Sequence, residues 1–249
     1  MFSPRSDDLF VASYPRSGTS MVQMILYQLL TEREVTFGHI SELMPFLERS
    51  LRVDEPIDRL PSPRVLKTHL PRKQVSRWPG RYIYVYRDGR DVLVSYFHMY
   101  KNYVNPMIEF LKFFEDFLAG RVQYGSWFQH VATWTTHQEP HVLFVRYEDL
   151  IRETKAEIKR IAEFIGVSIL PERNANILEQ CSFEFMRRNE AKFAPGSPAW
   201  PGRGPGTFIR EGRSGGWKDL MTQDQQLAFE QVAKKYAVSA AGNKITNKG

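Results

Sequence analysis

Four short runs of β-branched and aromatic residues, each bounded by polar or turn residues, predict buried strands. They cover residues 9–13, 65–67, 82–86 and 142–145. Apolar residues recur at helical spacing after Gly18 and again after Arg90, and further helical patterns cover residues 106–118, 126–136, 154–165, 171–181 and 222–236. Strands that alternate with helices predict an α/β fold, a central parallel sheet flanked by helices, with ligands bound at the carboxyl ends of the strands.

The segment 194–216 differs from the rest of the chain. It contains seven glycines and four prolines around Arg203, Arg210 and Arg213. This composition predicts a long loop, and loops of that length are usually functional lids or disordered segments. We expect it to cover a ligand. No internal repeat or linker interrupts the sequence elsewhere, so residues 1–249 are expected to form a single domain.

Composition narrows the class of protein. The chain has 249 residues, a net charge of +6 and a pI near 9.4, which favours an anionic partner. Its lysines and arginines are spread out rather than clustered, so a small, highly charged ligand is favoured over nucleic acid. The single cysteine, Cys181, excludes an intramolecular disulfide, and the six histidines lack metal-ligand spacing. No apolar run suits a membrane span or a signal peptide, so a cytoplasmic protein is expected.

The first strand runs directly into the turn 14–20, YPRSGTS, and then into a helix. Such a turn directs backbone N–H groups and the positive end of a helix dipole at one point, which makes an anion site. Arg16 adds a charge. The alternative is an ordinary N-cap beside an arginine. A Walker A loop, GxxxxGK[ST], is absent, which disfavours a nucleoside triphosphatase.

This turn resembles the 5′-phosphosulfate loop of the cytosolic sulfotransferases, usually written TYPKSGTTW. Arg16 stands at the family's lysine and Met21 at its tryptophan. The resemblance implies a P-loop-like, three-layer fold and a metal-independent sulfotransferase. The cofactor that the resemblance implies is 3′-phosphoadenosine-5′-phosphosulfate (PAPS), with PAP as the nucleotide product. The loop residues that would bind the cofactor are Arg16, Ser17, Gly18, Thr19 and Ser20.

The second strand leads into Lys67-Thr68-His69-Leu70-Pro71, which is similar to the family's KTHLP segment. The resemblance makes His69 the catalytic base, and an imidazole pKa near 6.5 suits proton removal from an acceptor hydroxyl. Lys67 would assist at the sulfuryl oxygens. Arg16 would stabilise the leaving nucleotide by electrostatics, because arginine does not readily give up its proton.

The third strand leads into YRDGRD at 86–91, which resembles the family's 3′-phosphate segment. If a helix begins near Asp88, Ser95 returns to the side of Arg87, and the two are expected to grip one phosphate. The alternative is a solvated network of ion pairs. Arg90 and Asp91 are expected to pair beside the site.

Three later segments extend the resemblance. Tyr147 and Phe183 lie in stretches similar to those that contact the nucleotide base, although an ordinary core role for Phe183 fits its spacing equally well. The segment 208–218 resembles the family's RKGxxGDW segment, with Glu211 in place of a lysine. Its expected cofactor-binding residues are Phe208, Ile209, Arg210 and Gly212. We expect Glu211 to point away from the phosphate or to weaken its binding, and Arg213 to replace the lost charge.

The ordered motifs, from Tyr14 to Trp217, predict transfer of a sulfuryl group from PAPS to a hydroxyl or amine of a small acceptor by in-line displacement. A catalytically weak nucleotide-binding regulatory module and a P-loop-like small-molecule kinase are the alternatives, with nucleic-acid binding a weaker third. Four aromatic residues suggest an apolar alcohol or phenol as acceptor: Phe97, Tyr100, Tyr103 and Phe193. The family's dimer motif matches only at Lys218 and Thr222, which leaves the oligomeric state open.

Overall fold

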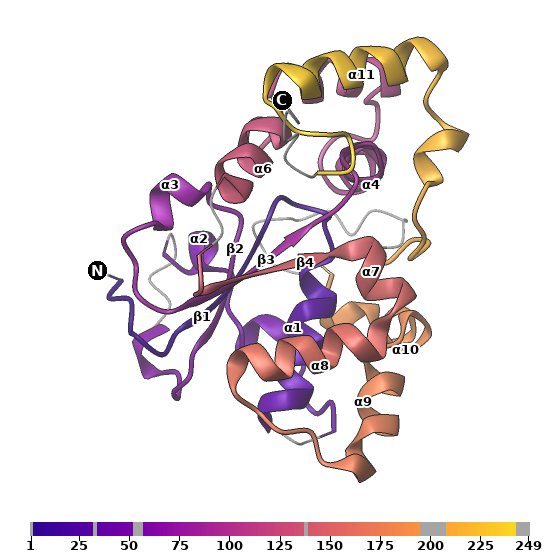
Figure 1. The fold of residues 1–249 in the computed structure, drawn as a ribbon. Helices are drawn as coiled ribbons and strands as arrows, with labels where there is room; N and C mark the ends of the chain where they lie inside the picture. The colour runs from indigo at the N-terminus through magenta and orange to yellow at the C-terminus, as the bar shows by residue number, and fades with distance from the viewer. Residues whose placement is uncertain (1, 32–33, 52–56, 137–138, 195–207, 243–249) are drawn as a thin grey trace.

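The computed structural model describes residues 2–31, 34–51, 57–136, 139–194 and 208–242 (Figure 1). At its centre lies a four-stranded parallel sheet in the order β2-β1-β3-β4. The strands are β1 (Leu9–Ser13), β2 (Val65–Thr68), β3 (Arg81–Tyr86) and β4 (Val142–Arg146). All four predicted strands are confirmed, with ends that differ by no more than one residue.

Each strand presents apolar side chains to both faces of the sheet, as expected for a parallel sheet covered on both sides. In β1, Leu9 and Val11 belong to one apolar cluster, and Phe10 and Ala12 belong to another on the opposite face. All five residues of β1 are buried. The continuous apolar run therefore reflects a central strand.

Helices cover the two faces and complete three layers (Figure 1). Side chains of α1 (Thr19–Thr31), α8 (Thr154–Ile165) and α9 (Asn174–Gln180) pack on the face that carries Leu9. The face that carries Phe10 packs against α2 (Leu47–Ser50), α3 (Arg72–Val75) and α6 (Trp127–Thr135). The predicted α/β architecture is confirmed.

A third cluster, rich in aromatic residues, lies beside the sheet and positions the helix that follows β3. It joins α4 (Gly89–Tyr103), α5 (Phe110–Leu118), α6 and α11 (Gln223–Lys235). At its centre the rings of Phe128 and Phe229 lie 4.9 Å apart. Burial of these rings fixes the first turn of α4 against the end of the sheet.

The predicted helices are found with adjusted bounds, and the short helices were missed. Helix α5 begins at Phe110 instead of residue 106, and the expected helix 171–181 is divided into a 3₁₀ turn (Pro171–Arg173) and α9. The missed helices are α2, α3, α7 (Tyr147–Arg152) and α10 (Phe183–Arg188), together with 3₁₀ turns at 40–42, 57–59, 190–192 and 216–219. The four missed α-helices have only four to six residues each, which are too few to show a 3.6-residue period.

Among the described residues, no helix is long and apolar enough to cross a membrane, and no three metal-ligating side chains cluster together. Cys181 is a buried free thiol. Of the expected covering loop, residues 195–207 lie outside the described part of the chain, and its ends at 194 and 208–216 lie within it.

Candidate active site

A cavity of about 620 Å³ lies where the strands end, and it collects the residues that the motifs singled out. Every predicted site residue except Ser17 lines it: Arg16, Gly18, Thr19, Ser20, Lys67, His69, Arg87, Ser95, Tyr147, Phe183, Phe208, Ile209, Arg210 and Gly212. Segments separated by up to about 200 residues therefore meet in one place. The volume is typical of a cavity that holds a small organic ligand.

The turn between β1 and α1 depends on unusual backbone conformations. Arg16 and Gly18 have positive φ angles of 71° and 101°. A Cβ atom at Gly18 would lie 2.5 Å from Cδ2 of Tyr147, so only glycine allows that ring to pack on the turn. The buried Oγ of Ser17 has no hydrogen-bond partner among the described residues. Beneath the turn, the hydroxyls of Ser13 and Thr19 lie 2.6 Å apart.

Arg16 extends from this turn across the cavity. Its Nε donates to Oγ of Ser95 (3.0 Å), and its guanidinium donates to the carbonyl of Phe208 (2.8 Å). Burial, together with the charges of Arg87 and Arg210, lowers the pKa of Arg16 to about 10. The side chain is therefore still protonated near neutral pH, and its charge has only neutral hydrogen-bond partners in the described structure.

Arg87 is a second cation without an acidic partner in the described part of the chain. It donates to the carbonyls of Arg16 (3.3 Å) and Arg213 (2.9 Å), and its guanidinium carbon lies 4.4 Å from the centre of the Tyr147 ring. Its buried Nε has no partner among the described residues. Ser95, which is expected to grip a phosphate together with Arg87, lines the same cavity, and its hydroxyl accepts from Nε of Arg16.

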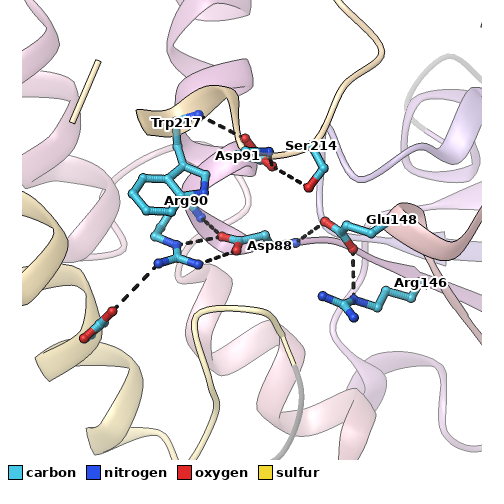
Figure 2. A network of polar contacts seen from close by, with 9 residues as sticks. Asp88, Arg90, Asp91, Arg146, Glu148, Ser214 and Trp217 are labelled. Atoms are coloured by element: carbon cyan, nitrogen blue, oxygen red, sulfur yellow. Dashed lines mark hydrogen bonds and ion pairs between the residues drawn. The ribbon is translucent and has the colours of Figure 1, made fainter. Parts of the chain in front are cut away.

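The acidic residues at the start of α4 have different partners from those expected (Figure 2). Arg90 forms its ion pair with Asp88 (2.6 Å) and lies 3.9 Å over the Trp217 ring. The prediction that Arg90 pairs with Asp91 was wrong. The carboxylate of Asp91 accepts instead from the backbone N–H groups of Gly215 (2.8 Å) and Trp217 (3.1 Å).

The contacts of Asp91 attach residues 214–217 to the start of α4 (Figure 2). Glu148, at the start of α7, accepts from the backbone N–H of Asp88 (3.0 Å) and from Arg146 (3.1 Å). A few residues earlier in the chain, a Cβ at Gly212 would lie 2.1 Å from Cδ2 of Phe183. The Phe183 ring is therefore packed on this backbone, next to Arg210.

Glu211 does not point away from the cationic side chains. It forms ion pairs with Arg210 and with Arg213 (2.6 Å to Nε), and Arg213 also pairs with Asp219. Of the two expectations for Glu211, its ion pair with Arg210 is consistent with weakened phosphate binding. Arg213, which is expected to replace the lost charge, is itself paired with two carboxylates. An anion that binds Arg210 must therefore compete with Glu211.

His69 is held in one tautomer by its contacts. Nδ1 lies 2.7 Å from the carbonyl oxygen of Ser13, and because a carbonyl only accepts, Nδ1 carries the proton. Nε2 is then unprotonated, and the ring lines the cavity although only 6% of the residue is exposed. Burial lowers the pKa of His69 well below 6.5, and the charge of Lys67 lowers it further, so the imidazole is neutral near pH 7.

Lys67 lies beside His69, with Nζ 4.8 Å from the centre of the Phe46 ring. Burial lowers its pKa to about 8, although the charge of Glu48 opposes this shift. Glu48 also accepts a hydrogen bond from the backbone N–H of His69 (2.6 Å). The helix α2 is thus attached to the end of β2 through this carboxylate.

Sequence reasoning missed four residues around His69: Phe46, Glu48, Tyr124 and His130. The rings of Phe46 and Tyr124 lie 5.1 and 5.2 Å from the His69 ring, and His130 Nε2 lies 3.2 Å from the His69 carbonyl, to which it donates. Phe46 and Glu48 lie in residues 34–51, where no helical or strand period would have identified them. The only local signal is the turn sequence Tyr124-Gly125-Ser126.

The expected apolar lining is only partly correct. Phe193 lines the cavity, whereas Phe97 and Tyr100 pack in the aromatic cluster of α4 and α5. Tyr103 is not among the lining residues. Phe46 and Tyr124 provide the aromatic walls beside His69 instead.

Comparisons with known proteins agree with this site. The sulfotransferase domain family matches residues 6–242. Sulfotransferase 1B1 of Mus musculus is 35% identical, over 94% of this chain and 84% of the relative. The structure of mouse sulfotransferase SULT7A1 complexed with PAP has a TM-score of 0.74 at 27% identity, covering 94% of this chain and 86% of that one. Retinol dehydratase in complex with androsterone and inactive cofactor PAP has a TM-score of 0.74 at 26% identity, covering 94% and 81%.

Proposed function

The chain belongs to the sulfotransferase domain family and is a PAPS-dependent sulfotransferase, and we propose that it sulfonates a small acceptor hydroxyl or amine with His69 as base. The observation that supports this proposal is one cavity that holds the neutral imidazole of His69 and two cations without acidic partners in the described structure, Arg16 and Arg87. Sulfuryl transfer resembles phosphoryl transfer in requiring alignment and charge stabilisation more than covalent catalysis.

The cavity residues fit the anionic ends of PAPS. At the 5′ end, Arg16 and the unpartnered Ser17 hydroxyl accompany Gly18, Thr19 and Ser20 at the N-terminus of α1. An oxyanion there gains from backbone N–H groups and the helix dipole.

Arg87 would bind the 3′-phosphate, because its Nε has no partner among the described residues. Ser95, Arg210 and the backbone of 208–212 lie in the same cavity and would complete that site. Tyr147 and Phe183 offer ring faces for the adenine.

The proposed transfer step uses His69 as base and two cations to stabilise charge. Nε2 of His69 takes the proton from the acceptor hydroxyl as its oxygen bonds to sulfur, while the bond from sulfur to the bridging oxygen of the nucleotide breaks. Arg16 and Lys67 stabilise the negative charge that moves onto these oxygens. Because its pKa of about 10 keeps Arg16 protonated, Arg16 acts by electrostatics and not as an acid.

The acceptor is proposed to be an apolar alcohol or phenol, because Phe46, Tyr124 and Phe193 line the cavity. The androsterone bound to retinol dehydratase, a relative of similar fold, is consistent with an apolar alcohol as acceptor. Two expectations stay predictions: a single domain over residues 1–249 and a cytoplasmic location. The oligomeric state stays undecided.

Steady-state kinetics of His69→Ala test the proposal, with His141→Ala as the control because His141 is half exposed and lies outside the cavity. We expect kcat to fall by more than about tenfold in His69→Ala, with PAP affinity unchanged by calorimetry. A smaller loss would remove His69 from the role of base. Binding of PAP by the wild type without turnover of any acceptor would favour a regulatory module, and loss of activity on chelation of Mg²⁺ would favour a kinase.

A further inference from the structure

Arg49 differs from the other four arginines that line the cavity. Arg16, Arg87, Arg210 and Arg213 each donate to a carbonyl, a hydroxyl or a carboxylate of the chain. The side chain of Arg49, on α2, has no hydrogen bond or ion pair to any described residue, yet it lines the same cavity and is only partly exposed. A partly desolvated guanidinium without a partner is unfavourable, so this position suits an anionic ligand.

The position of Arg49 separates it from the proposed nucleotide site. The residues proposed to bind PAPS come from the turn after β1 and the start of α1, from the position directly after β3, from α4, α7 and α10, and from segment 208–212. Arg49 follows Phe46 by three residues, and the Phe46 ring lies 5.1 Å from His69. Arg49 therefore belongs to the side of the cavity that faces His69 from α2, where the acceptor would bind.

The acidic residues of the cavity do not neutralise Arg49. Asp91 accepts from two backbone N–H groups, and Glu211 is paired with Arg210 and Arg213. Glu184 also lines the cavity, and the described structure shows no ion pair between it and Arg49. Glu48, the neighbour of Arg49, is directed to the backbone of His69.

We propose that Arg49 determines acceptor specificity, by binding a carboxylate on an otherwise apolar alcohol or phenol whose hydroxyl faces His69. This inference rests on the proposed function and narrows its acceptor class. Apolar walls at Phe46 and Met44 contact the body of such a molecule, while Arg49 binds its charged end. Arginine suits this role because its planar fork of donors matches a carboxylate.

Two matched pairs of acceptors test the proposal: p-hydroxyphenylpropionate with its primary amide, and ω-hydroxylauric acid with its primary amide. Within each pair the hydroxyl is the same and only the charge differs. The variants are Arg49→Gln and, as control, Arg77→Gln, which removes an exposed arginine outside the cavity. We expect Arg49→Gln to lower kcat/KM for the acid of at least one pair by roughly 10- to 100-fold, and for its amide by less than about threefold.

Equal changes for acid and amide in both pairs, or a wild-type preference for the amides, would overturn the role of Arg49. Binding of the same four compounds to the PAP complex, measured by calorimetry, separates this failure from failure of the proposed function. If PAP binds but no acceptor is sulfonated, the proposed function fails. The acid preference in binding, and its loss in Arg49→Gln, would still establish the Arg49 contact, and equal binding of acid and amide would refute it.

Discussion

Replacing Glu211 by glutamine is expected to tighten PAP binding, contrary to the usual effect of mutating a residue in a binding cavity. Glu211 pairs with Arg210, the residue proposed to bind the 3′-phosphate. The hydrogen bond from Arg213 and the nearby arginine charges lower the pKa of Glu211 against the opposing effect of burial, so the carboxylate is ionised near pH 7. Binding of the 3′-phosphate must displace this carboxylate or bind beside it.

The magnitude follows from the exposure of the pair. The side chains of Arg210 and Glu211 are 31% and 33% exposed, so their attraction has the strength of a surface ion pair, about 0.2–1 kcal/mol. Repulsion between Glu211 and a phosphate of charge near −2 at about 6 Å in water adds roughly 1 kcal/mol. Removing both effects is expected to tighten PAP binding by about 1–2 kcal/mol, or roughly 5- to 30-fold.

The assay is calorimetric titration of PAP and of adenosine 5′-monophosphate, which lacks the 3′-phosphate. Glu211→Gln is expected to tighten PAP alone, and added salt reduces the gain because the pair is partly exposed. The control is Asp219→Asn, which removes one of the two carboxylates paired with Arg213 but keeps the pair between Arg210 and Glu211. Weaker PAP binding in Glu211→Gln, or an equal gain for both nucleotides, would refute the reasoning and remove Arg210 from the 3′-phosphate site.

Three further predictions concern the groups that support the site. Glu48→Gln removes the charge that raises the pKa of Lys67, so the alkaline limb of the kcat/KM profile is expected to move below pH 8; an unmoved limb would contradict a role for protonated Lys67. Arg64→Met leaves the buried carboxylate of Asp8 without the guanidinium that lies 2.7 Å away, and the free energy of unfolding in urea is expected to fall by about 3–5 kcal/mol. A decrease of less than about 1 kcal/mol would show that the pair does not stabilise the fold. Burial lowers the pKa of His130 to about 4, so between pH 6.5 and 4 the unfolded chain binds a proton that the folded chain does not. The free energy of unfolding is therefore expected to fall by about 3 kcal/mol as the pH drops from 6.5 to 4. His130→Gln should lack this component, and an identical pH dependence of unfolding in both proteins would disprove it.

Local sequence determined the elements of the fold because their signals are short-range. Parallel strands buried on both faces need continuous apolar runs, so β1 and β3 were recognisable from the sequence. The turn around Gly18 was likewise visible, since its glycine and hydroxyl residues stand between a strand and an amphipathic helix. Arg16, Arg87 and His69 each follow a strand, and parallel strands place their carboxyl ends on one edge. Their meeting in one cavity followed from this topology.

Only the tertiary structure decided which charged side chains form ion pairs within the chain and which are left to bind a ligand. Arg90 pairs with Asp88 and not with Asp91, and Glu211 pairs with Arg210. The side chain of Arg49 has no hydrogen bond or ion pair to the described residues. Each choice depends on distances of a few ångströms between segments far apart in sequence, and on burial that strengthens one pairing over another. The sequence determined which side chains approach the nucleotide, and packing determined how many of them are available to bind it.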